Sequence, residues 1–116
     1  MAEISKETEQ HVIEFQQLQG QLQMVIMQRS QLKGQADEVE GALETLKKAQ
    51  GKVYRSTGLV LVEAAKDELT KELGEKKDTI LVRVQVLAKQ EEKLRSRLVE
   101  LKAKIDAATK GMKGGS

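Results

Sequence analysis

The sequence lacks cysteine, proline and tryptophan, and its 116 residues include only one tyrosine and one phenylalanine. Without cysteine the chain forms no disulfide and performs no thiol chemistry, which fits a cytoplasmic location. Because bulky side chains are so few, we do not expect a sizeable globular core. No apolar run approaches the roughly 20 residues that cross a bilayer, and residues 1–30 show no apolar core behind a basic start. We therefore expect neither a membrane segment nor a signal peptide.

Charged residues are abundant but nearly balanced. They make up 33% of the sequence, while the net charge is only +2. Charges of both signs mixed along a chain without proline are typical of long, solvated helices packed along a narrow seam. Such a balance gives little support for nucleic-acid binding, which depends on clustered cations. We expect one domain over residues 1–116, with no nucleic-acid or membrane partner.

Apolar residues recur at alternating spacings of three and four in two long stretches, at about 4–50 and 66–111. This spacing is typical of coiled coils, because it places the residues along one stripe of a helix. Basic residues before Gly51 predict the end of the first helix, and the acidic pair 67–68 predicts the start of the second. The glycine-rich stretch 112–116 is expected to be a flexible tail. The predicted seam comprises Ile4, Thr8, His11, Phe15, Leu18, Leu22, Val25, Arg29, Leu32, Ala36, Val39, Leu43 and Leu46, and then Thr70, Leu73, Lys77, Ile80, Val84, Leu87, Glu91, Leu94, Leu98, Leu101, Ile105, Ala108 and Met112.

Between the two helical stretches, residues 52–63 have the composition of a β-hairpin. Gly58 supplies the positive φ that a short hairpin loop commonly needs, and the second strand is expected over residues 59–62 with both faces apolar. A two-stranded sheet is marginal alone and leaves its edges unpaired, so we expect these strands to pair with other chains. The hairpin residues expected to drive assembly are Val53, Tyr54, Gly58, Leu59, Val60, Leu61 and Val62.

The predicted fold class is mainly α. Two helices of similar length joined by a short hairpin fold back into a long antiparallel two-helix coiled coil. Arg29 and Glu91 interrupt the apolar seam, and folding about Gly58 brings them to within about a helical turn of each other. We predict that they form a pair that specifies register more than stability. The alternative is that both side chains reach solvent independently.

No arrangement of residues indicates an enzyme. The only histidine, His11, has no cysteine or second histidine with which to complete a metal site. No Ser/His/Asp grouping and no glycine-rich phosphate loop is present. We expect no catalysis, no cofactor and no metal.

Several apolar residues lie outside the seam in the half of each helix away from the hairpin. Flexible methionines among them suit a surface that adapts to non-native polypeptide. The alternative is a broadened interface with a neighbouring helix, and the sequence does not separate the two. The off-seam candidates for client binding are Val12, Ile13, Met24, Met27 and Val99, with Ile26 beside them, and Met112 of the seam is a further candidate.

Helix, hairpin and helix together resemble the prefoldin family, and within it the beta class of archaeal prefoldin. Residues 14–19 are similar to the family's glutamine-rich first helix, and residues 37–46 to the segment leading to its hairpin. The strongest similarity lies in residues 53–62, followed by 65–69. A single hairpin favours the beta class, because the alpha class carries two.

The resemblance implies a hexamer of two alpha-type and four beta-type chains, whose hairpins join into an inter-subunit β-barrel. It also implies an ATP-independent chaperone that holds unfolded polypeptides at the coiled-coil tips and delivers them to a group II chaperonin. The implied partners are alpha-type subunits, further beta copies, unfolded polypeptides and that chaperonin. Two other classes stay open, a structural or filament-forming coiled-coil protein and a plain adaptor coiled coil.

Overall fold

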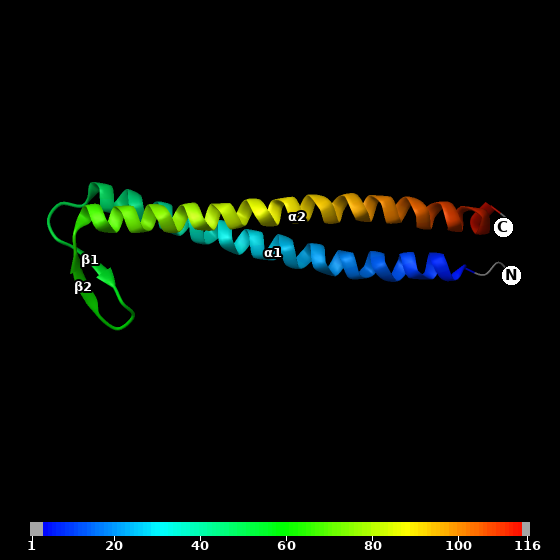
Figure 1. The fold of residues 1–116 in the computed structure, drawn as a ribbon, viewed down its shortest axis with the longest axis horizontal. Coiled ribbons are helices and arrows are strands. Elements are labelled where there is room, and N and C mark those ends of the chain that lie inside the picture. The colour runs from blue at the N-terminus through cyan, green and yellow to red at the C-terminus, as the bar shows by residue number, and fades with distance from the viewer. Residues whose placement is uncertain (1–3, 115–116) are drawn as a thin grey trace. The chain divides into compact units, whose positions relative to one another are not determined.

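The computed structural model describes residues 4–114, and the side chains of residues 4–110. In chain order it contains helix α1 (Lys6–Lys48), strand β1 (Val53–Ser56), strand β2 (Leu61–Ala64) and helix α2 (Lys66–Gly114) (Figure 1). The predicted fold class, two long helices joined by a single β-hairpin, is confirmed. A single chain does not test the inter-subunit barrel, which stays a prediction.

The start of α1 is capped by a side chain. The Ser5 hydroxyl accepts a hydrogen bond from the Thr8 backbone N–H at 3.1 Å, which satisfies one of the free donors of the first turn. The Thr8 side chain is buried and its hydroxyl lies 2.9 Å from that of Ser5. Thr8 therefore serves both the cap and the seam.

A lysine joins the end of α1 to the start of α2. The Lys66 ammonium donates hydrogen bonds to the backbone carbonyls of Lys47 at 3.3 Å and Ala49 at 3.0 Å. These carbonyls have no partner within a helix, and a cation complements the negative end of the helix dipole. Gly51 follows with φ +87°, a left-handed conformation that suits the residue after a helix. Two features thus explain why α1 ends at Lys48, close to the predicted residue 50: the hydrogen bonds from Lys66 and the left-handed conformation of Gly51.

Helix α2 extends beyond its predicted end at residue 111. It continues to Gly114, so the expected tail is wrong for residues 112–114, while residues 115–116 lie outside the described part. One glycine costs a helix only about 1 kcal/mol, and extending an existing helix needs no new nucleus. Gly111 is therefore accommodated within the helix.

The second strand of the hairpin lies two residues further along the chain than the predicted 59–62. Strands β1 and β2 pair antiparallel, from Val53 opposite Ala64 to Ser56 opposite Leu61. Residues 57–60 form the loop, in which the Val60 carbonyl accepts a hydrogen bond from the Thr57 N–H at 2.8 Å. Gly58 has φ +87°, as expected. The placement of Leu59 and Val60 in the second strand is wrong, because both lie in the loop that this hydrogen bond closes, and β2 begins at Leu61.

The chain divides into two compact units, and each pairs part of α1 with part of α2. Of the described residues, the first unit contains those up to Gln28 and those from Leu87, and the second contains Arg29–Val86. The buried residues of the helices all belong to the predicted seam: Thr8 and Leu101 in the first unit, and Leu32, Ala36, Val39, Leu46 and Ile80 in the second. Three seam members near the helix ends are exposed, Ile4, Thr70 and Ala108.

Candidate interaction surfaces

The hairpin leaves most of its apolar side chains in solvent. Leu59 is fully exposed at the loop and Leu61 is 69% exposed, whereas Val53 at the base is buried. In the described part of the chain the sheet contains only β1 and β2, so the outer edge of each strand has no neighbour there. Unpaired edges beside apolar side chains favour pairing with strands of other chains. The exposed apolar residues of the hairpin are Tyr54, Leu59, Val60, Leu61 and Val62.

Side-chain contacts hold the hairpin to α2. Arg55 of β1 contacts Glu72 of α2, with Nη2 2.6 Å from Oε1. A groove of about 770 Å³ follows all four residues of β1 and the adjoining parts of both helices. In Figure 1 the hairpin turns away from the ends of α1 and α2 to which it is joined. The hairpin is therefore joined to α2 by a side-chain contact as well as by the chain.

The first unit carries the predicted off-seam apolar residues. We define its apolar surface as four exposed side chains: Ile13, Met24, Met27 and Val99, with exposures of 55%, 59%, 59% and 70%. Val12 is half-buried, and the side chain of Met112 lies outside the described residues. Exposure of this kind is what contact with another polypeptide requires. Client binding by these residues stays a prediction.

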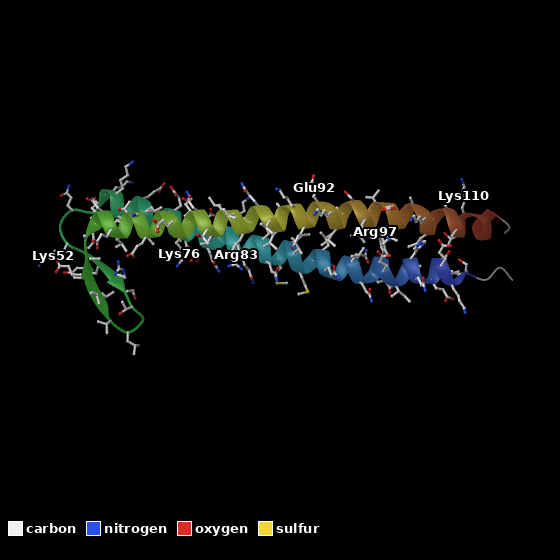
Figure 2. All side chains as sticks on the ribbon, in the orientation of Figure 1. Lys52, Lys76, Arg83, Glu92, Arg97 and Lys110 are labelled. Atoms are coloured by element: carbon white, nitrogen blue, oxygen red, sulfur yellow. The ribbon has the colours of Figure 1, made fainter. Side chains whose placement is uncertain are left out.

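An ion-pair network joins the helices of the first unit. Arg97 of α2 forms two hydrogen bonds with Glu14 of α1 and an ion pair with Glu100 at 3.1 Å (Figure 2). The hydrogen bond from Arg97 lowers the pKa of Glu14 below its ordinary value, and the same guanidinium lowers the pKa of Glu100. In the second unit, Lys77 of α2 is hydrogen-bonded to Glu40 of α1, and this bond raises the lysine pKa. Among the described residues, a charged contact therefore joins α1 to α2 in each unit.

A groove lies beside the seam of the first unit. Its volume is about 380 Å³, and its lining combines apolar and hydrogen-bonding side chains. Gln21, Gln28, Gln90 and Lys93 are exposed, as is Met24, whereas Val25 and Leu94 are half-buried. The lining residues are Gln21, Met24, Val25, Gln28, Gln90, Lys93 and Leu94.

Of the residues lining this groove, the sequence analysis predicted only Met24 as a client-binding candidate, and it assigned Val25 and Leu94 to the seam. The repeat itself provided a further signal, because all three glutamines occupy the seam-flanking g position of the heptad when Leu22 and Val84 are assigned to a.

A second set of residues was also missed. Leu81, Val82 and Val86 are exposed apolar side chains of α2 in the second unit.

Arg29 and Glu91 are both half-buried, as polar members of a seam should be. Glu91 forms an ion pair with Arg95 of the same helix at 3.8 Å. Arg29 belongs to the second unit and Glu91 to the first. Their predicted register pairing stays a prediction.

Residues 4–110 contain no group of three or more His, Cys, Asp or Glu side chains that could hold a metal ion. His11 is half-buried. Among the described residues, neither α1 nor α2 includes a stretch long and apolar enough to cross a membrane.

Comparison with known proteins gives consistent matches along the chain. The family model described as prefoldin subunit matches residues 9–111. The beta subunit of prefoldin from Archaeoglobus fulgidus is 42% identical over 107 residues, which cover 90% of this chain and 92% of that protein. The beta subunit from Pyrococcus furiosus is 34% identical over 97 residues, covering 82% and 83% of the two chains. The crystal structure of the prefoldin beta subunit from Thermococcus strain KS-1 matches with a TM-score of 0.87 at 32% identity, covering 93% of this chain and 96% of that one.

Proposed function

The chain belongs to the prefoldin family of non-enzymatic chaperones, among its beta-type subunits, and we propose that it captures unfolded polypeptides without ATP and transfers them to a group II chaperonin. The chaperone role follows from the family. The proposal adds the mechanism and the surface through which this chain acts.

The observation that carries the proposal is the apolar surface of the first unit. Ile13, Met24, Met27 and Val99 are each more than half exposed, although each could have been polar without loss to the seam. Unfolded chains expose scattered apolar groups, and a surface that holds them must offer adaptable contacts that are individually weak enough for release. Unbranched methionine side chains suit this requirement.

Assembly with other prefoldin subunits follows from the family, and its arrangement is part of the proposal. We assign two alpha-type and four beta-type chains to one hexamer, joined through their hairpins into an inter-subunit β-barrel. The exposed edges of β1 and β2, together with Leu61 and Val62, support this assignment because a partner strand would cover both. Several tethered surfaces would also raise the affinity for one client by about 10² to 10⁴ through avidity. The cytoplasmic location stays a prediction.

The test follows the aggregation of a chemically denatured protein by light scattering after dilution, with and without the assembled chain. We expect suppression in the absence of ATP, no change when ATP is added, and recovery of native client only after a group II chaperonin with ATP is supplied. A plain adaptor coiled coil would not suppress aggregation, and a filament-forming coiled coil would be distinguished by particle size, which light scattering also measures. Absence of suppression by the assembled chain would therefore contradict the proposal.

A further inference from the structure

The groove of the first unit lies where the residues that flank the seam change from a charged pair to neutral glutamines. In an antiparallel pair of helices, g positions of one helix face g positions of the other across one side of the seam. Glu14 and Arg97 are such a pair, and their two hydrogen bonds cover that side. One heptad further along α1 and one heptad back along α2, the corresponding positions are Gln21 and Gln90. Two neutral amides thus replace an ion pair.

This replacement leaves hydrogen-bonding capacity unused. Within the part of the chain whose side chains are described, the side-chain amides of Gln21, Gln28 and Gln90 make no hydrogen bond. Each amide offers two N–H donors and an oxygen acceptor. Below them lie the half-buried side chains of Val25 and Leu94, with the exposed Met24 at the rim. The groove therefore combines an apolar floor with amide groups that are free to bind a ligand.

We propose that this groove is a subsite for an extended segment of unfolded polypeptide, whose main chain hydrogen-bonds to the three glutamines while one of its apolar side chains contacts the floor. The glutamine side chain carries the same amide group as the peptide bond, so it can donate to a peptide carbonyl and accept from a peptide N–H. Main-chain groups are free in every unfolded chain and mostly paired in a folded one. Recognition of this kind distinguishes unfolded from folded clients without demanding a particular sequence.

The fourth polar side chain of the groove adds a charge preference. Lys93 is exposed, and among residues 4–110 it makes no ion pair. Its ammonium at the edge of the groove favours segments in which an acidic residue lies next to the apolar one. The volume of about 380 Å³ accommodates a few side chains and a short length of main chain. The inference rests on the proposed function, because it specifies what the client-binding surface recognises.

The test uses fluorescence anisotropy with the assembled chain and a labelled, unstructured peptide that has a leucine–valine–leucine centre. One version is flanked by aspartates and one by lysines, and a third carries N-methyl groups on the central amides of the aspartate version. We expect the aspartate version to bind about two- to fivefold more tightly than the lysine version, as for an exposed ion pair. N-methylation should weaken binding roughly two- to tenfold, because it removes main-chain donors.

Two variants locate these effects. Lys93→Glu should reverse the charge preference, whereas Lys89→Glu, the same charge change on α2 outside the groove lining, should preserve it. The double variant Gln21→Glu with Gln90→Arg should form an ion pair like that of Glu14 and Arg97, cover the groove and weaken all three peptides. A charge preference that Lys93→Glu leaves unchanged, or equal binding of the N-methylated peptide, would overturn the inference. Suppression of aggregation by the parent chain is measured separately, so the proposed function can hold while this inference fails.

Discussion

Glu14 of α1 and Arg97 of α2 are joined by two hydrogen bonds, from Nε to Oε1 at 2.9 Å and from Nη2 to Oε2 at 3.1 Å, although 83 residues separate them in the sequence. A bidentate contact fixes the orientation of both side chains, because the planar guanidinium matches the two carboxylate oxygens. It therefore ties one position of α1 to one position of α2. The contact defines which residues of the first unit face each other.

This contact predicts a pH dependence. Arg97 lowers the pKa of Glu14 in the folded chain below its value in the unfolded chain, so the stabilisation is present above the unfolded pKa and is lost as the pH falls through the folded pKa. Thermal unfolding followed by circular dichroism should show Glu14→Gln less stable than the parent at neutral pH, with the difference disappearing once the pH falls below the lowered pKa of Glu14. High salt should reduce the difference as well.

Glu92→Gln is the matched control, since Glu92 is an exposed carboxylate of the same unit without an ion pair among the described residues (Figure 2). It should change stability little at any pH. If Glu14→Gln lowers the unfolding temperature by the same amount at neutral and acidic pH, the ion pair is not the cause.

If the chains assemble through their hairpins, a single charged side chain introduced into the hairpin should strongly weaken assembly. Leu61 of β2 is 69% exposed in the single chain, and we expect it to be covered in the assembled particle. Leu61→Asp would then place an unpaired carboxylate in the interface, which costs several kcal/mol unless the interface opens. Native mass spectrometry should show smaller species for this variant, with helicity retained. An unchanged particle mass would exclude Leu61 from the interface.

Replacing glycine by alanine should have opposite effects on stability at two positions of the second unit. An alanine Cβ at Gly34 in α1 would meet nothing within 4 Å, so Gly34→Ala should stabilise the chain by about 1 kcal/mol. Gly58 has φ +87°, and an alanine there should cost roughly 1 to 2 kcal/mol. Denaturant unfolding of the two variants measures both. Destabilisation by Gly34→Ala would show that its surface is covered in the assembled protein.

The helices and their buried face could be predicted from the sequence because one periodicity decides both. The spacing that identifies a coiled coil also selects Leu32, Ala36, Val39 and Leu101 as seam residues, and all four are buried. The limits of the strands could not be predicted in this way. In a hairpin this short, the alternation of residues does not tell whether Leu59 belongs to a strand or to the loop, and the hydrogen bond that closes the loop decides it.

The groove of the first unit was missed in the sequence analysis for a different reason. Gln21 and Gln90 lie on separate helices, and their relation depends on which g positions face each other. That relation is fixed by the contact of Glu14 with Arg97. The sequence contains all four residues, but their pairing is a property of the folded unit.

The most direct test of the account compares two triple serine variants in the aggregation assay. The first variant replaces Ile13, Met24 and Met27 on the apolar surface of the first unit, and the second replaces Leu81, Val82 and Val86, which are exposed apolar residues of the second unit. Each removes three exposed apolar side chains outside the predicted seam, and particle mass and helicity are measured for both. We predict that the first variant loses most of its capacity to suppress aggregation of a denatured protein, while the second retains it. Equal suppression by the first variant and the parent, with mass and helicity unchanged, would contradict the proposal that this surface captures unfolded polypeptides.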